Sequence, residues 1–193
     1  FEQQRGTITA ADFDSFWHGV LQRGAWSDPS ATYNGQSPKA PPLPNEAEPA
    51  HFDGPHNDNS FYLAPFASSS LTDGRGADLP WLQAMPDPIT TATWRTWIEI
   101  NDKKANDMDL KEGDVIKVES AHGSILALAY PHPGISPEVV AIPIGQGHIG
   151  GGRYSKNRGS NVLSILAPST DTGSGAWAWA ATRVTIEKTG DWI

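Results

Sequence analysis

Apolar side chains recur at helical spacing near the start of the chain and at strand spacing over much of the remainder. Between Thr9 and Arg23, five large apolar residues follow the i, i+3, i+4, i+7, i+8 pattern of one helix face. These residues are Phe13, Phe16, Trp17, Val20 and Leu21. Thr9 is the expected N-cap, and Gly24 stands where a helix usually ends. The pattern predicts an amphipathic helix whose apolar stripe needs a partner surface.

The helical periodicity stops between Trp26 and Asn59. Six prolines between residues 38 and 55 favour extended chain over a hydrogen-bonded ladder: Pro38, Pro41, Pro42, Pro44, Pro49 and Pro55. We therefore expect residues 1–59 to form a helix and a Pro-rich arm or linker, and residues 60–193 to form a separate domain. His51 and His56 in this arm match no metal-ligand spacing, so we predict no metal site.

Short apolar runs separated by turns indicate a β-rich second domain. We expect a short helix over 102–108, for which Asn101 can be the cap, and a short apolar element over 162–166. The expected strands are 61–67, 94–100, 115–120, 125–130, 139–144 and 183–188. Six or more short strands with few helices predict a small barrel or a sandwich.

Composition narrows the classes of function. The chain has 22 acidic and 14 basic residues and a net charge of −8, which argues against nucleic acid as a partner. It contains no cysteine, which excludes disulfides, iron–sulfur ligation and thiolate chemistry within it. No apolar run approaches the roughly 20 residues that span a bilayer. Phe1 is not preceded by a Met or a basic leader, so we expect the chain to be part of a larger protein.

One segment, Gly145–Asn161, carries only positive charges in a chain that is negative overall. We call it the glycine loop. It holds six glycines, three cations and two asparagines, and no Asp or Glu occurs between Glu138 and Asp171. Glycines let backbone amides approach an anion, and the cations Arg153, Lys156 and Arg158 can add charge-assisted hydrogen bonds. The glycine loop is therefore either a binding site for an anionic, polar ligand or a flexible surface loop.

The order of motifs resembles the C-terminal domain of the molybdopterin oxidoreductases, the dimethyl sulfoxide reductase superfamily. The resemblance covers about residues 61–188. It rests on a strand that ends in Asn101, a Gly-Asp turn and Val-rich strand within Leu110–Ser124, and the motifs Gln146-Gly147-His148 and Gly159-Ser160-Asn161-Val162-Leu163. It implies a six-stranded double-psi β-barrel that holds the guanine dinucleotide part of a bis-molybdopterin cofactor.

Carried over by position, the resemblance implies a set of residues that contact the cofactor. They are Ser68, Ser69, Ser70, Arg75, Asn101, Gln146, Gly147, His148, Asn157, Arg158 and Asn161. The alternative interpretation is a helix cap for Asn101 and a solvated turn for the three serines. In the family the redox-centre ligands lie elsewhere in the chain. The resemblance therefore implies no catalytic residue and no metal ligand here, and this segment should catalyse nothing on its own.

The motif Asp73–Gln83, followed by Pro86-Asp87-Pro88 and the glycine loop, is most similar to one branch of the family. That branch is the large molybdopterin-like subunit of alternative complex III and related membrane quinone-reductase complexes, which keeps the fold without the molybdenum cofactor. The alternative function is therefore a cofactor-free structural module that packs against iron–sulfur and other subunits. The resemblance implies that the rest of the large subunit and the iron–sulfur and membrane subunits are partners. It also implies a peripheral location on the periplasmic side of the bacterial inner membrane.

A third interpretation is an unrelated barrel of the aspartic protease kind. The tripeptide Asp171-Thr172-Gly173 matches the protease motif, but it occurs once, inside a turn rich in Ser, Thr and Gly. An aspartic protease needs two carboxylates placed close together. A protease would therefore require a dimer, and the sequence favours the other two functions.

Overall fold

The computed structural model describes residues 8–28, 35 and 49–193. The chain divides into two units, Phe1–Glu48 and Pro49–Ile193. Most of the predicted Pro-rich arm, including Pro38, Pro41, Pro42 and Pro44, lies outside the described residues.

The first unit contains helix α1, Phe13–Arg23. The helix begins later than predicted because Asp12, rather than Thr9, is its N-cap. The Asp12 carboxylate accepts hydrogen bonds from the amide and hydroxyl of Ser15 at 2.8 Å and 3.1 Å. Gly24 ends the helix with a φ of 73°, as its position predicts. No residue of α1 is buried, and Phe13, Trp17 and Leu21 of the apolar stripe are exposed.

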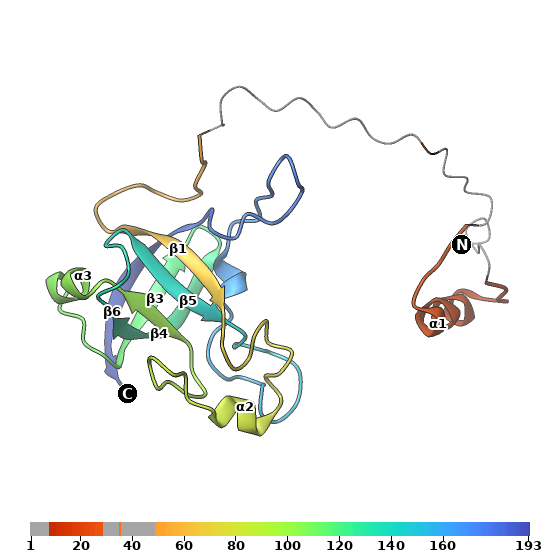
Figure 1. The fold of residues 1–193 in the computed structure, drawn as a ribbon, viewed down its shortest axis with the longest axis horizontal. Coiled ribbons are helices and arrows are strands. Elements are labelled where there is room, and N and C mark those ends of the chain that lie inside the picture. Colours follow the sequence, from red (N-terminus) through yellow and green to blue (C-terminus); the bar gives the residue numbers. More distant parts are fainter. Residues whose placement is uncertain (1–7, 29–34, 36–48) are drawn as a thin grey trace. The chain divides into compact units, whose positions relative to one another are not determined.

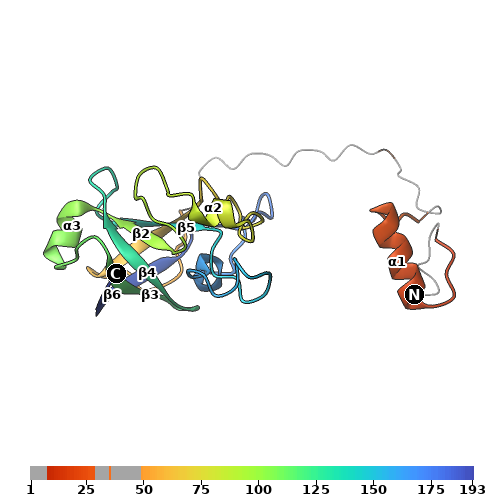
Figure 2. The same ribbon diagram turned by 90° about the horizontal axis from the view of Figure 1, so that it is seen from below.

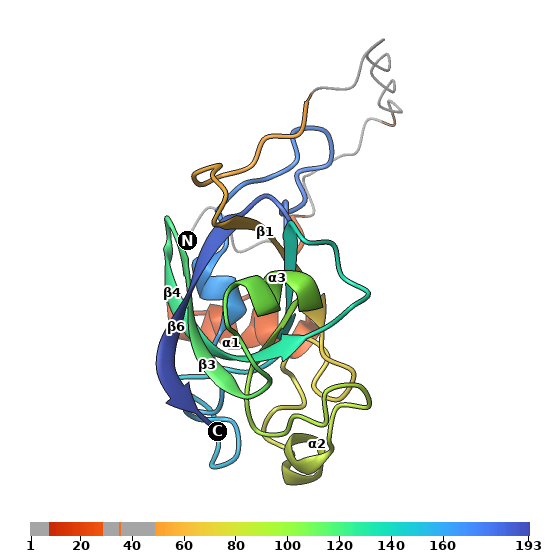
Figure 3. The same cartoon turned by 90° about the vertical axis from the view of Figure 1, so that its left-hand side faces the viewer.

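The second unit is built on six strands. They are β1 Ser60–Ala67, β2 Trp97–Ile100, β3 Asp114–Ser120, β4 Gly123–Pro131, β5 Val139–Ile144 and β6 Arg183–Trp192. They close in the order β1-β5-β2-β4-β3-β6. Figures 1 and 3 show this sheet from two sides. The β1–β5 and β2–β4 pairs are parallel and the other four pairs are antiparallel. The expectation of a mainly β domain with six strands and few short helices is confirmed.

Inward-facing aliphatic residues from the strands form the core. Burial alternates along β6, for example, where Val184 and Ile186 are buried and Thr185 between them is less so. The fully buried strand residues include Ile98, Ile100, Ile116, Val118, Val140 and Ile142. Each contributes about 1.5–3 kcal/mol to folding by leaving water. This core fixes the strand ends from which the loops emerge.

Three short helices lie between the strands: α2 Pro80–Ala84, α3 Asp102–Asp107 and the 3₁₀ helix η2 Val162–Ile165. Strand β2 runs antiparallel to β5, so α3, which follows β2, and the glycine loop, which follows β5, emerge at opposite ends of the barrel. Figures 1 and 2 both show α3 at one end and α2 with the glycine loop at the other. We refer to these as the α3 end and the glycine-loop end.

Strand β2 is shorter than predicted at its start. Trp94, which the sequence places in the strand, has a φ of 60° and cannot continue a β ladder. Within the described part of the chain, no helix has the length and apolar character needed to cross a membrane.

Candidate functional site

A cavity of about 960 Å³ opens at the glycine-loop end of the barrel. The glycine loop supplies most of its wall, and β3, β4 and η2 add Lys117, Leu126 and Ser164 among others. Asp73, from the loop after β1, also lines it. Five of the predicted site residues line it: Gln146, Gly147, His148, Asn157 and Asn161. Residues distant in sequence therefore meet in one concave site, as expected for a binding loop on a rigid barrel.

The first half of the glycine loop offers unused backbone donors to this cavity. Among the described residues, no acceptor pairs with the amides of Ile149, Gly150 or Gly151. All three residues line the cavity and are exposed. Successive backbone N–H groups in a concave turn form an anion-binding site without a charged side chain.

Gly147 brings the two halves of the loop together. Its φ is 83°, and a Cβ atom at this position would overlap the backbone of Ser160 and Asn161. Its amide donates to the carbonyl of Arg158 at 2.7 Å, so this predicted ligand donor is already used inside the protein. Gly147 instead permits the close backbone contact that holds Asn161 at the cavity.

The second half of the loop is held by an internal carboxylate. Asp78 accepts hydrogen bonds from the amides of Tyr154 and Ser155 at 3.3 Å and 3.2 Å and from the Ser155 hydroxyl at 3.1 Å. Burial opposes ionisation, but these hydrogen bonds outweigh it and lower the pKa of Asp78. Gly152 leaves room for the carboxylate, which a Cβ atom would overlap. Sequence reasoning missed this role of Asp78, because no local pattern links it to residues so far along the chain.

The start of the loop is held by a pair of glutamines. The Gln146 side-chain amide donates to Gln83 Oε1 at 2.8 Å, and Gln83 Nε2 lies 3.2 Å from Gln146 Oε1. Gln83 is 2% exposed and also donates to the Ala77 carbonyl at 2.8 Å. Residues 77–83, which we call the 77–83 clamp, thus fix the loop on both sides of the free amides.

The three loop cations do not converge on the cavity. Arg153 lies over the Tyr154 ring at 5.6 Å, Arg158 lies over the Trp94 ring at 5.2 Å, and neither is in the cavity wall; nor is Lys156. The cation that does line it is Lys117, which pairs with Glu119 at 2.7 Å. The prediction that all three loop cations face the same pocket as the amides is therefore wrong for this cavity.

The loop after β1 is folded on itself. Ser68 Oγ accepts from the Leu71 amide at 3.3 Å, and Ser69 donates to Asp87 at 3.4 Å. Ser68 and Ser70 line a much smaller pocket beside Gln146. The Arg75 guanidinium donates to both carboxylate oxygens of Asp73, at 2.6–3.1 Å, and these bonds lower the pKa of that carboxyl strongly. Arg75 is therefore paired with Asp73, which lines the cavity, and is not itself in the cavity wall.

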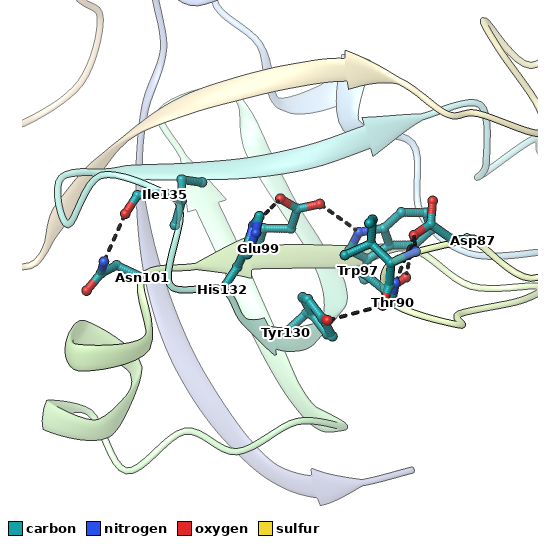
Figure 4. A network of polar contacts seen from close by, with 9 residues as sticks. Asp87, Thr90, Trp97, Glu99, Asn101, Tyr130, His132 and Ile135 are labelled. Atoms are coloured by element: carbon teal, nitrogen blue, oxygen red, sulfur yellow. Dashed lines mark hydrogen bonds and ion pairs between the residues drawn. The ribbon is translucent and has the colours of Figure 1, made fainter.

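Asn161 and Asn101 both cap helices, but at opposite ends of the barrel. Asn161 Oδ1 accepts from the Leu163 amide at 3.1 Å, and its Nδ2 has no acceptor in the described part of the chain. Asn101 is buried; its Oδ1 accepts from the amides of Lys103 and Lys104, and its Nδ2 donates to the Ile135 carbonyl at 2.8 Å (Figure 4). Both ends of the Asn101 side-chain amide are thus bonded within the protein.

The α3 end carries a polar network whose members satisfy one another (Figure 4). His132 is partly buried, and its Nδ1 lies 3.1 Å from Glu99 Oε2. Trp97 Nε1 donates to the other Glu99 oxygen at 3.4 Å. By contrast, the His148 Nε2 at the glycine-loop end is buried and has no partner among the described residues.

The aspartic protease interpretation finds no support in the geometry. Asp171 Oδ1 accepts from both the amide and the hydroxyl of Ser174 at 2.7 Å, so this carboxylate stabilises its own turn. The described residues contain no group of three or more His, Cys, Asp or Glu side chains that could hold a metal ion.

Comparison with known proteins identifies similar sequences. The family model described as "Molydopterin dinucleotide binding domain" matches residues 82–181. The arsenate respiratory reductase molybdopterin-containing subunit ArrA of Chrysiogenes arsenatis is 32% identical over 72% of this chain. The menaquinone reductase molybdopterin-binding-like subunit of Nitratidesulfovibrio vulgaris is 29% identical over 52% of it. This chain spans only 18% and 16% of the length of these two relatives.

A solved structure shares the fold. Acetylene hydratase from Pelobacter acetylenicus superposes with a TM-score of 0.51 and 18% identity, over 66% of this chain and 18% of the hydratase. At this identity the likeness is one of fold.

Proposed function

The chain belongs to the molybdopterin dinucleotide-binding domain family, and from this premise we propose that the glycine-loop cavity holds the dinucleotide end of a molybdopterin cofactor. The observation that carries the proposal is the set of three unused amides at Ile149, Gly150 and Gly151 in the cavity wall. A pyrophosphate is an anion with many acceptor oxygens, and such amides are its natural donors.

The side chains around these amides suit the rest of a dinucleotide. Asn161 Nδ2 is a donor without an acceptor among the described residues, and it lines the same cavity as the amides. Lys117, which is paired with Glu119, also lies in this wall. Both acidic groups near the loop are already neutralised or bonded: Asp73 by Arg75, and Asp78 by the Tyr154–Ser155 turn. A phosphate entering the cavity would therefore meet donors without an unpaired carboxylate in the wall.

The finer features of the proposal are those that the resemblance to the family implies. We propose the guanine form of the dinucleotide, within a bis-molybdopterin cofactor, and the double-psi arrangement of the six-stranded barrel. The parent would be a large reductase subunit with iron–sulfur and membrane subunits as partners, on the periplasmic side of the inner membrane. The cofactor supplies redox chemistry when it is bound; the residues described here bind and orient it.

One alternative has support of its own, namely a cofactor-free structural module of a respiratory complex. Arg153, Lys156 and Arg158 are absent from the cavity wall, and Asp78 already occupies the amides of the second half of the loop. The menaquinone reductase relative is itself described as molybdopterin-binding-like. On this alternative the cavity packs against a neighbouring subunit.

Asn161→Asp in the parent protein separates the two functions. Aspartate keeps the cap on η2 but replaces a free donor with a negative charge in the cavity wall. Asn106→Asp is the matched control, since Asn106 is exposed on α3 at the other end of the barrel. Mass analysis of small molecules released by denaturation measures the bound cofactor.

If the dinucleotide binds in the cavity, we expect Asn161→Asp to lose most of the pterin dinucleotide and Asn106→Asp to retain it. A correctly assembled wild-type parent without any pterin dinucleotide would contradict the proposal. Weakened association between subunits in Asn161→Asp, together with absent cofactor in the wild type, would support the structural alternative.

A further inference from the structure

Helix α2 turns one side into the protein and the other side towards solvent. Gln83 on the inner side is buried, and Leu82 packs against Gly76, where a Cβ atom would lie 2.7 Å from Leu82 Cδ1. Trp81 and Met85 lie one helical turn apart on the other side and are 65% and 44% exposed. An aromatic ring and a thioether at this spacing form an apolar patch of the kind that marks contacts between protein surfaces. We call this side the α2 face, and its exposed residues are Leu79, Trp81, Ala84 and Met85.

The chain around the α2 face offers no free charge to a partner. The sequence from Gly76 to Trp94 contains no Lys, Arg, His or Glu, and its only ionisable side chains are two carboxylates. Asp78 is bonded to the glycine loop. Asp87 accepts from the amides of Ile89 and Thr90 at 3.0 Å and 2.9 Å, so it stabilises its own turn. The α2 face therefore complements an apolar, uncharged surface, because a charged partner would lose its hydration here without gaining an ion pair.

The inner side of the same segment holds the loop that lines the glycine-loop cavity. Gln83 is bonded to Gln146 on one side of the three free amides, and Asp78 is bonded to the Tyr154–Ser155 turn on the other side. The loop can leave the barrel only when these bonds open. A partner that binds the α2 face recognises the closed clamp and not the open one, so its binding makes such local openings rarer.

The position of α2 indicates what covers its exposed side. Figures 1 and 2 show α2 at the glycine-loop end, where the cavity proposed for the dinucleotide also lies. The chain spans only 18% and 16% of the length of its ArrA and menaquinone reductase relatives. In the proposed function the reactive end of the cofactor continues past this domain, so the rest of the parent polypeptide has to approach the barrel at this end. It is therefore the body most directly placed to cover the α2 face.

We propose that the α2 face is the surface on which an apolar, uncharged segment from the rest of the parent polypeptide docks, and that this docking steadies the glycine loop through the 77–83 clamp. The inference rests on the proposed function, which brings the parent to this end of the barrel. Trp81 is the expected anchor, because tryptophan side chains that fill a desolvated pocket dominate the energy of interfaces. Met85 adapts to the shape of the surface beside it.

Photocrosslinking from position 81 in the parent protein identifies what covers the α2 face. Trp81→p-benzoylphenylalanine places an aromatic, photoreactive probe there, and mass analysis of the digested adducts locates the segment in contact. We expect adducts with apolar peptides of the same polypeptide that lie outside residues 1–193. The same probe at Asn106, exposed on α3 at the other end of the barrel, is the matched control and should not form them. Adducts with another subunit or a second copy of the chain, or no protein adduct at all, would overturn the inference.

Hydrogen exchange separates docking from a folding defect. In the parent protein, Trp81→Glu places a charge in the apolar contact, and we expect exchange at residues 149–156 to become several-fold faster. In the 193-residue chain on its own, the same substitution should leave exchange at these residues unchanged, because no docked segment is lost.

Trp179→Glu in the parent is the matched control for this measurement. Trp179 is 41% exposed and stands in the loop between η2 and β6, which Figures 1 and 3 show on the other side of the barrel from α2. We expect it to leave exchange at residues 149–156 unchanged. An unchanged rate in the Trp81→Glu parent, or an equal acceleration in the isolated chain, would contradict the link between the α2 face and the loop.

The outcomes also distinguish this inference from the proposed function. Adducts from position 81 to the parent polypeptide, together with a wild type that releases no pterin dinucleotide, would support the docking surface and contradict the cofactor site. A parent that retains pterin dinucleotide but forms no adduct from position 81 would support the cofactor site and overturn the docking surface.

Discussion

The two asparagines that cap helices at opposite ends of the barrel differ in how their side chains are bonded. Asn101 at the α3 end and Asn161 at the glycine-loop end each cap a short helix. Asn101 is 7% exposed and uses both ends of its side-chain amide within the protein, whereas Asn161 is exposed and keeps its donor free beside three free backbone amides. The capping role stabilises the fold at both ends. The unused donors at the glycine-loop end make a site for a ligand.

Gly147→Ala should cause the largest loss of stability, by disrupting the glycine-loop end. The new methyl group would overlap the Ser160–Asn161 backbone, and the residue would hold a φ of 83°. We expect the free energy of unfolding to fall by at least about 2 kcal/mol, as measured by denaturant titration. Gly150→Ala is the control, because no atom lies within 4 Å of the point that its new methyl group would occupy; it should change stability by less than about 0.5 kcal/mol. Equal effects at both positions would refute the role of Gly147 in closing the loop.

Replacing each capping asparagine with alanine tests the difference between the two ends of the barrel. Asn101→Ala leaves the Ile135 carbonyl and two helix amides without a partner, so we expect a loss of about 1–3 kcal/mol in unfolding free energy. Asn161→Ala loses a single exposed cap bond, with an expected loss of about 0.5–1 kcal/mol. Pyrophosphate affinity should show the reverse order, falling in Asn161→Ala only. A larger loss of affinity in Asn101→Ala would contradict the assignment of the ends.

Acid should weaken the barrel through Asp114 of β3. Its side chain accepts from Lys188 at 2.9 Å and from the Lys111 amide at 2.7 Å, and these bonds lower the pKa of Asp114. A lowered pKa in the folded state stabilises the protein above the ordinary Asp pKa of about 3.9, and this contribution is lost as pH falls through the folded-state value. Unfolding free energy measured from pH 7 to pH 3 should therefore fall less steeply in Asp114→Asn than in the wild type. Parallel curves for the two proteins would show that the ion pair contributes nothing.

Asp78→Ala should change the global stability least, and its main effect should be local, at the Tyr154–Ser155 turn. It removes the anchor of the Tyr154–Ser155 turn but leaves the core untouched. We expect hydrogen exchange at residues 152–156 to become several-fold faster while the unfolding midpoint changes little. Asp78→Asn should restore part of the protection, since an amide oxygen can still accept. Unchanged exchange in Asp78→Ala would mean that the 77–83 clamp does not hold the loop.

The sequence predicted the parts of this fold that depend on local pattern. Alternating apolar residues located all six strands, and Gly24 and Asn101 marked helix boundaries correctly, because caps and alternation are properties of neighbouring residues. The positive φ of Trp94, which shortens β2, could not be inferred in this way, because the apolar pattern carries no sign of a positive φ at a bulky residue. The preference for Asp12 over Thr9 as a cap was a choice between two suitable residues.

The sequence predicted which loop forms the site, but not which of its donors are free or where its side chains point. An acid-free stretch rich in glycine indicated where donors would gather, and five of its predicted members do line one cavity. Which donors remain free depends on long-range partners: Asp78 takes the amides of the second half, Arg158 takes that of Gly147, and Gln83 fixes Gln146. The direction of the cations is equally a tertiary property, since Arg153 and Arg158 turn towards aromatic rings.

Hydrogen exchange of the full chain with and without GDP tests the central claim, that the free amides of the glycine loop bind phosphate, most directly. We expect slower exchange at the amides of Ile149, Gly150 and Gly151 and around Asn161, and no change at residues 101–107 of the α3 end. Protection confined to the α3 end, or no protection at the three loop amides at a saturating concentration, would contradict it.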